Sequence, residues 1–162
     1  MRKLTTLLLA AMLPLAPAAA LAAGSHSGGH HDEMMLGKPA EPAQAERTIA
    51  VRMLETDDGE MLFEPSSIAV KRGETVLLDI RNDGELEHEF VMDGQEAIQE
   101  HKALMEKFPE MEHADPNSVR LEPGESGQIA WTFTNDGSFE FACLIPGHYE
   151  SGMHGPLDVA AK

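Results

Sequence analysis

A short segment near the C-terminus carries three side chains that bind soft metal ions: Cys143, His148 and Met153. Two histidines and a cysteine, with a weakly bound axial methionine, form the ligand set of a blue-copper site. The second histidine is expected to be His88, which lies upstream at the start of an apolar, strand-like segment. These residue types predict one type 1 copper centre with the ligands His88, Cys143, His148 and Met153.

Cys143 is the only cysteine in the chain, which excludes an intramolecular disulfide and a dinuclear copper centre bridged by two thiolates. A buried cysteine can also be a small apolar residue with no chemical role, and this is the alternative interpretation of Cys143. An unpaired thiol in an exported protein is prone to oxidation, however, and this favours the metal-binding interpretation.

The N-terminus has the features of a secretory signal peptide. A basic start, Met1-Arg2-Lys3, precedes an apolar stretch that ends in the small-x-small pattern Ala20-Leu21-Ala22. Cleavage near Ala22 would remove residues 1–22 and leave a periplasmic protein, whereas an uncleaved leader would act as a membrane anchor. No later segment approaches the roughly 18 apolar residues that a membrane span needs, so no membrane association is expected after cleavage.

Residues 23–46 form a low-complexity tail and a linker rich in proline and alanine. Such a segment has little to bury and is expected to be disordered without metal. Imidazole and thioether groups gather in it, and short histidine-rich tracts are typical of metal binding. We expect weak binding of additional copper there, the alternative being a plain solubilising spacer. The candidate ligands are His26, His30, His31, Met34 and Met35.

The formal net charge of −16 argues against nucleic acid as a partner and favours metal ions or cationic proteins. The same charge would keep the protein soluble whatever its function. We expect a monomer.

From residue 47 to residue 162 the apolar residues alternate with polar ones, which is typical of half-buried strands. Dipeptides that favour turns, such as Asp83-Gly84 and Pro123-Gly124, separate these segments. Short strands at this spacing predict an antiparallel β-sandwich. The alternating apolar sets are Ile49/Val51/Met53, Val76/Leu78/Ile80, Ile129/Trp131/Phe133, Phe139/Phe141/Cys143 and Leu157/Val159.

One segment, from Gln95 to Phe108, breaks this pattern because it is rich in helix formers and its apolar residues recur at helical spacing. The spacing predicts a short helix inserted after the His88 strand. A second copper site at the helix and its exit is one interpretation, and packing of Met105 and Phe108 on the sandwich is the alternative. The candidate ligands of this second site are His101, Met105, Met111 and His113.

These motifs together resemble the cupredoxins, the single-domain type 1 copper proteins. The resemblance covers about residues 47–160 and rests on His88 and on the Cys143, His148 and Met153 segment. More narrowly, His88-Glu89-Phe90-Val91 and the inserted helix resemble the periplasmic copper-tolerance cupredoxins called CopI. The resemblance implies a Greek-key β-sandwich with one inserted helix, and a copper-binding protein rather than an enzyme.

Two functional classes follow from the resemblance. The histidine- and methionine-rich tail favours a copper-tolerance protein that binds excess periplasmic copper. The type 1 segment alone would also suit a soluble electron carrier between a c-type cytochrome and a reductase or oxidase. A transient redox partner would contact an apolar patch around His148, formed by Leu144, Ile145 and Pro146.

One residue departs from the pattern of many electron-carrying cupredoxins. These proteins have asparagine directly after the first histidine ligand, whereas this chain has Glu89. Groups that contact the cysteine sulfur tune the potential and geometry of a copper centre, so neither property carries over from the resemblance.

Overall fold

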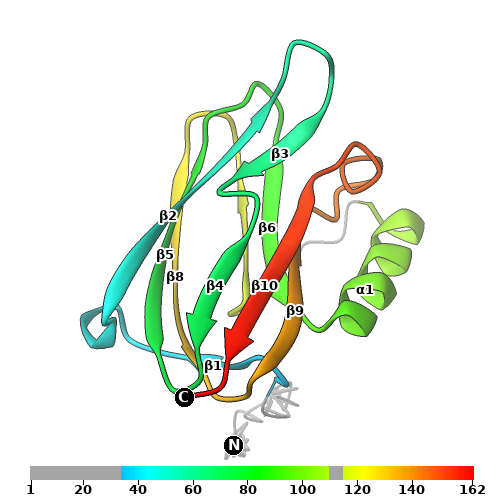
Figure 1. The fold of residues 1–162 in the computed structure, drawn as a ribbon. Coiled ribbons are helices and arrows are strands. Elements are labelled where there is room, and N and C mark those ends of the chain that lie inside the picture. The colour runs from blue at the N-terminus through cyan, green and yellow to red at the C-terminus, as the bar shows by residue number, and fades with distance from the viewer. Residues whose placement is uncertain (1–33, 110–114) are drawn as a thin grey trace, which may run out of the picture. The chain divides into compact units, whose positions relative to one another are not determined.

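Two five-stranded sheets pack face to face in the computed structural model, which describes residues 34–109 and 115–162 (Figure 1). The first sheet has the order β1 (Gly37–Pro39), β8 (Ser126–Phe133), β5 (Thr75–Asn82), β2 (Arg47–Glu55) and β3 (Met61–Glu64). The second has the order β4 (Ile68–Lys71), β10 (His154–Ala160), β9 (Gly137–Ala142), β6 (His88–Asp93) and β7 (Ser118–Leu121). The structure therefore confirms the predicted β-sandwich.

The prediction that all strands pair antiparallel was wrong for two pairs. Strand β2 runs parallel to β5, and β4 runs parallel to β10, while the other pairs are antiparallel. Alternation of apolar residues reports which face of a strand is buried, but it carries no information about the direction of the neighbouring strand.

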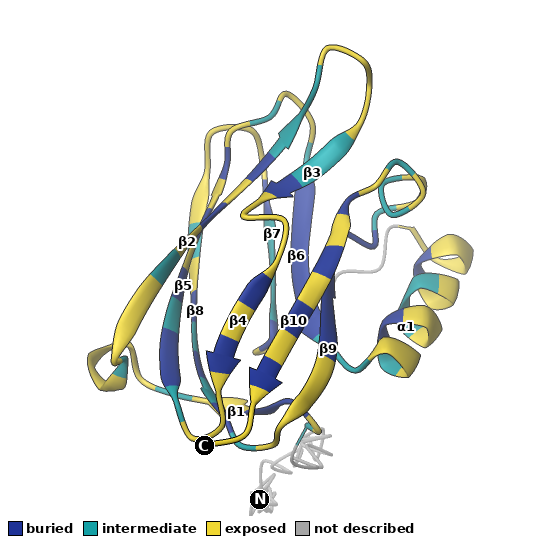
Figure 2. Ribbon diagram, in the orientation of Figure 1, coloured by how far each residue is buried: buried dark blue, intermediate teal, exposed yellow. Residues whose placement is uncertain are grey.

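The core lies between the sheets and is built from the predicted alternation. Buried and exposed residues alternate along β4 and β10 in Figure 2, as expected for strands with one face on the core and one in water. Val76 on β5 lies opposite Trp131 on β8 in the register, and Leu78 lies opposite Ile129. Val76, Leu78, Ile80 and Trp131 are all fully buried in the core. Removing this apolar area from water is the main stabilising contribution to the sandwich.

The folded domain begins before the predicted boundary at residue 47. Strand β1 pairs with β8 through Gly37 and Phe133, and Leu36 beside it is fully buried in the core. A short 3₁₀ helix, Pro42–Gln44, follows. The segment that we predicted as linker therefore supplies an edge strand. Proline is tolerated there because Pro39 ends the strand at the edge of the sheet.

The predicted helix is present as α1 (Gln95–Lys107), which packs on the outer face of the second sheet (Figure 1). Its Ile98 and Met105 are buried against Val91 of β6 and Leu144, which follows β9. The expected packing of Met105 is confirmed, whereas that of Phe108 was wrong, since its side chain is 58% exposed. The helix ends at Lys107, so Phe108 leaves the helical face that carries Met105.

Leu78→Ala should lower the free energy of unfolding by about 2–5 kcal/mol, because it removes buried methyl groups and leaves a cavity between the sheets. Leu104→Ala is the matched control, since Leu104 lies on α1 and is 45% exposed. The control should change stability by less than about 0.5 kcal/mol. Urea unfolding of both variants measures the difference, and equal destabilisation would contradict the assigned core.

Candidate metal centre

Three neighbouring strands bring the predicted ligands together at one end of the second sheet. Strand β9 lies between β10 and β6. Cys143 directly follows β9, Met153 directly precedes β10, and His88 is the first residue of β6. The segment from Cys143 to Met153 connects β9 to β10. Because these two strands are paired, the two ends of the segment lie close together.

His88, Cys143 and His148 form the one group of potential metal-binding side chains found among the described residues, with ligand atoms all within 4.8 Å of one another. The Nδ1 atoms of His88 and His148 are 3.3 Å apart, and Cys143 Sγ lies 3.4 Å from His148 Nδ1. Both rings therefore turn the same nitrogen toward the sulfur. The structure confirms that these three predicted residues lie together.

The connection that carries Cys143, His148 and Met153 is folded on itself by backbone hydrogen bonds. The Cys143 N–H donates to the Met153 carbonyl at 3.0 Å, and the Met153 N–H donates to the His148 carbonyl at 3.1 Å. Gly147 has φ +90°, a conformation that residues with a Cβ rarely adopt. The turn at Gly147 thus directs His148 back toward Cys143, and Met153 is fully buried beside them.

Helix α1 holds the outer side of this connection. Tyr149 packs against the cluster that α1 forms with Leu144, and its hydroxyl is 3.1 Å from Gln99 Nε2. Lys102 of the helix forms an ion pair with Glu150. The helix therefore restrains the residues that follow His148, which limits movement of that ligand.

The Cys143 thiol is fully buried, and its surroundings decide its protonation. Burial raises the pKa of Cys143 from 9.0 to about 12, although the Glu89 N–H, 3.3 Å from Sγ, favours the thiolate. The negative charge of Glu89 raises this pKa further. Without a cation the sulfur therefore stays protonated near neutral pH.

Glu89 stands where many cupredoxins have asparagine. Its backbone and its side chain lie in different environments. Its backbone N–H donates to the cysteine sulfur, a contact that does not depend on the identity of the side chain. Its carboxylate is buried on the outer face of β6, opposite Arg120 of β7 in the register.

The second ring nitrogen of His88 contacts a carboxylate. Glu55 Oε1, at the end of β2, lies 2.8 Å from His88 Nε2. Burial raises the pKa of Glu55, but hydrogen bonds from the Glu85 and Leu86 N–H groups and from His88 outweigh it, so the net pKa is below the usual value. Glu55 is therefore ionised at neutral pH.

The two histidines differ in their access to solvent. His88 is fully buried, whereas His148 is half-buried. Burial, followed by the repulsion of His88, holds the pKa of His148 below its usual value. A lowered pKa keeps the imidazole neutral, which is the form that binds metal.

The donor set and its spacing fit copper. Imidazole nitrogens bind first-row metals at about 2 Å, and two such nitrogens around one ion lie roughly as far apart as these Nδ1 atoms. Thiolate and thioether select copper(I), imidazole accepts either copper state, and a His₂Cys set with methionine is the type 1 arrangement. The cluster is fully buried at His88, Cys143 and Met153, so water has little access to the metal position.

The other predicted copper ligands divide into three groups. His26, His30 and His31 in the tail, together with Met111 and His113, lie outside the described residues. Met34 is half-buried and its backbone pairs with Gly37 in an isolated β-bridge, whereas the side chain of Met35 is 74% exposed. Met105 is buried among apolar residues, and His101 on the same helix is half-buried.

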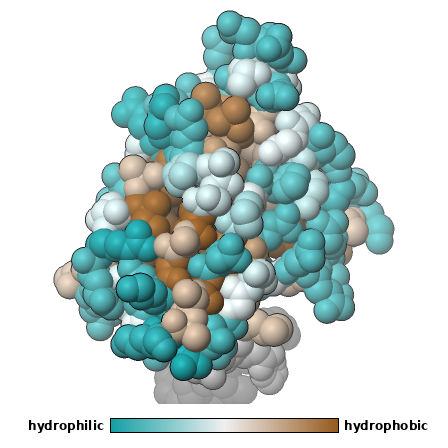
Figure 3. Space-filling view, in the orientation of Figure 1, coloured by the Kyte–Doolittle hydropathy of each residue, from teal (hydrophilic) through white to brown (hydrophobic). Residues whose placement is uncertain are grey.

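The apolar patch predicted around His148 is smaller than expected. Leu144 is 1% exposed because α1 covers it, and Ile145 is half-buried, so Pro146 is the exposed member of the three. Figure 3 shows one face of the molecule, on which hydrophilic residues surround smaller hydrophobic areas.

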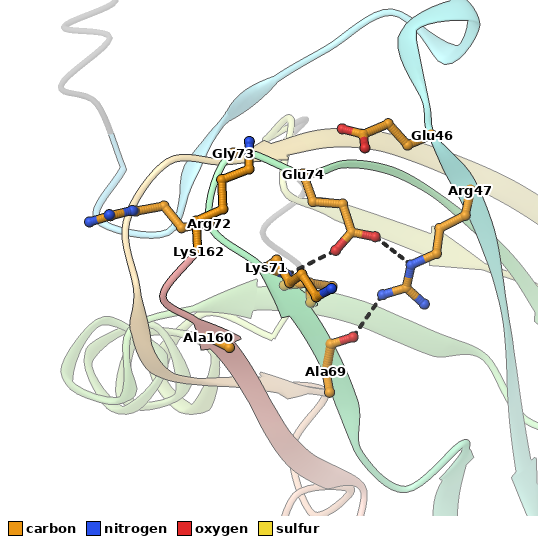
Figure 4. A pocket seen from close by; sticks show the side chains of 10 residues that line it. Glu46, Arg47, Ala69, Lys71, Arg72, Gly73, Glu74, Ala160 and Lys162 are labelled. Carbon is orange, nitrogen blue, oxygen red and sulfur yellow. Dashed lines mark hydrogen bonds and ion pairs between the residues drawn. The ribbon is translucent and has the colours of Figure 1, made fainter.

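A pocket of about 570 Å³ lies at the other end of the sandwich, near Arg47 at the start of β2 and Ala160 at the end of β10 (Figure 4). Arg47 crosses it, pairing with Glu74 at 2.5 Å and donating to the Ala69 carbonyl at 2.7 Å. Its lining contains no histidine, cysteine or methionine, so it is unsuited to soft metals. Among the described helices, none has the length and apolar character of a membrane span.

Sequence reasoning missed two polar contacts near the centre. Glu55 is far from His88 in the sequence, and nothing in its spacing marks it as a partner. Glu140 on β9 is buried, accepts a hydrogen bond from the Tyr149 hydroxyl at 2.8 Å and lies 3.2 Å from His154 Nδ1. The one signal in the sequence is that Glu140 alternates with Phe139 and Phe141, which places its side chain on the face of β9 that points away from the core.

In copper-free protein at about pH 10, the Cys143 thiolate should be absent from the ultraviolet spectrum, because its pKa is about 12 rather than 9.0. The urea-unfolded chain ionises at the lower value, so the folded state should lose stability as pH rises from about 9 toward 12. Spectroscopic titration of folded and unfolded protein tests both points. A folded-state midpoint near 9 would show that the sulfur is accessible to water.

Comparison with known proteins points in the same direction as this geometry. Residues 50–160 match the family of copper binding proteins described as the plastocyanin/azurin family. The chain is 47% identical over 137 residues to the copper-resistant cuproprotein CopI of Rubrivivax gelatinosus, covering 83% of this chain and 81% of that protein. It is 39% identical over 152 residues to the protein of the same name from Pseudomonas aeruginosa, covering 76% and 81%.

Solved structures share the fold at lower identity. Auracyanin B has a TM-score of 0.61 and 23% identity, covering 76% of this chain and 96% of its own. Reduced auracyanin from Roseiflexus castenholzii has a TM-score of 0.59 and 24% identity, covering 72% and 98%. At these identities the likeness shows the sandwich fold, while the sequence match shows the family. The chain belongs to the plastocyanin/azurin family of copper-binding proteins.

Proposed function

We propose that this protein binds one copper ion through His88, Cys143, His148 and Met153 and protects the periplasm against excess copper. The observation that carries the proposal is the buried cluster of two Nδ1 atoms and one sulfur at the end of the second sheet. Two relatives named copper-resistant cuproproteins, at 47% and 39% identity, support the physiological role.

Each ligand has a distinct task. Cys143 loses its proton on binding and supplies the thiolate, which the Glu89 N–H stabilises. His88 and His148 present Nδ1, and buried Met153 provides the thioether at the other end of the same connection. The bound metal would supply one-electron Cu(I)/Cu(II) chemistry. Because strands, turn and helix α1 hold the ligands, they should move little between the two states.

Location and tail complete the proposal. Residues 1–22 would direct export to the periplasm and be removed near Ala22. The tail ligands His26, His30, His31, Met34 and Met35 would collect additional copper weakly, in either oxidation state. Exposure of Met35 is consistent with that task, since a thioether in water is available to an incoming ion.

The second candidate function is a soluble electron carrier that meets a redox protein such as a c-type cytochrome. The observation in its favour is that His148 is half-buried and follows the exposed Pro146 and Gly147, so one ligand reaches toward the surface. The same feature would serve redox cycling in copper tolerance, and a growth experiment distinguishes the two roles.

Cys143→Ser should abolish the visible colour of the copper(II) protein, because thiolate-to-copper charge transfer requires the sulfur. The β-sandwich should persist, which circular dichroism would show. His154→Gln is the control, since His154 stacks on Tyr149, pairs with Glu140 and lies outside the ligand cluster. If the Cys143→Ser protein kept the absorption band, the assignment of the site would be wrong.

Deletion of the gene should sensitise cells to copper and leave respiratory growth nearly normal. Growth curves over a range of copper concentrations, with and without a plasmid copy of the wild-type gene, measure this. A plasmid copy carrying Cys143→Ser should fail to restore tolerance. Impaired respiratory growth with normal copper tolerance would instead favour the electron carrier.

A further inference from the structure

The imidazole of His88 is held from both sides. Its Nδ1 faces His148 and Cys143, and its Nε2 lies 2.8 Å from Glu55 Oε1. The His88 side chain is fully buried, while that of Glu55 is 17% exposed at the surface end of β2. Glu55 therefore stands between solvent and the ring nitrogen that does not face the metal position.

The Glu55 carboxylate is itself fixed by the chain that leads into β6. Its Oε2 accepts a hydrogen bond from the Glu85 N–H at 2.9 Å, and its Oε1 accepts one from the Leu86 N–H at 3.0 Å. At Gly84 a Cβ would lie 2.4 Å from Oε2, so the backbone approaches the carboxylate closely there. The position of this carboxylate is set by β2 and by the loop before His88 together.

This arrangement selects one form of the imidazole. Both oxygens of Glu55 already accept backbone hydrogen bonds, from Glu85 and Leu86, so the carboxyl group acts as an acceptor here and the proton between Glu55 and His88 belongs to Nε2. A neutral imidazole with its proton on Nε2 has its lone pair on Nδ1, the atom that faces His148 and Cys143. The tautomer that can bind metal is thus the one that the contact with Glu55 requires.

We propose that Glu55 is the positioning residue of the copper site: it fixes the tautomer and ring orientation of His88 before metal binds, and its negative charge then favours the higher oxidation state. Carboxylates that contact the outer nitrogen of a histidine ligand raise its basicity and orient it. The alternative is that Glu55 only ties the Glu85 and Leu86 backbone to β2 and leaves the ligand unaffected. The inference rests on the proposed copper site.

The tautomer is measured in copper-free protein by long-range proton–nitrogen NMR of the imidazoles. In the wild type, His88 should be protonated at Nε2, with a proton that exchanges slowly. Glu55→Gln should keep this tautomer because its amide oxygen can still accept the hydrogen bond. Glu55→Ala removes the acceptor and should give a mixture of tautomers.

Copper loading tests the effect on the metal. Glu55→Ala should weaken copper binding by about 10- to 100-fold, as is usual when the partner of a histidine ligand is removed. Glu55→Gln should shift the reduction potential upward. The matched control is Glu85→Gln, which removes the same charge from the adjacent loop, where the contact with Glu55 is made by the backbone. The shift in the control should be smaller.

The inference is overturned if wild-type His88 carries its proton on Nδ1, or if Glu55→Gln and Glu85→Gln have equal potentials. Should Glu55→Ala fail to fold, the wild-type tautomer and the Glu55→Gln potential still decide the question. Failure of the wild type to bind copper would refute the proposed function instead, and the tautomer in copper-free protein would remain a separate result.

Discussion

Burial of the Cys143 thiol beside β6 and β10 is the constraint on which the rest of the site depends. A sulfur removed from water resists ionisation, and the pKa of about 12 expresses that cost. The Glu89 N–H lowers the cost only in part, so a stable thiolate needs a cation within reach. The order β10, β9, β6 places two imidazoles next to the sulfur, where they can hold that cation.

The charges near the centre are mostly negative. Glu55 contacts His88, buried Glu89 follows it in β6, and Glu87 precedes it, forming an ion pair with Arg120 at 2.5 Å. Negative charge favours the more highly charged copper state, and the guanidinium offsets part of it. The ligand types themselves favour the opposite state through sulfur. These two effects act on the potential of the centre in opposite directions, and the Glu89 N–H contact to the sulfur acts on it as well.

Both the β-sandwich and helix α1 restrain the connection from Cys143 to Met153. The sandwich holds both of its ends, through pairing of β9 with β10, and the Met61 N–H donates to the Ser151 carbonyl at 3.0 Å. Helix α1 covers the outside, where Leu144 is buried and Tyr149 packs. The helix that we considered as a second copper site therefore has a clear structural role, because its buried face supports the first site.

The sequence alone determined the copper ligands, the helix and the faces of the strands, because these depend on residue type and local spacing. His88, Cys143 and His148 were found because soft-metal chemistry restricts which side chains can take part. Strand β1, the two parallel pairs and the contact of Glu55 with His88 were decided only by tertiary structure. They join segments far apart in the chain, and local spacing carries no information about such neighbours.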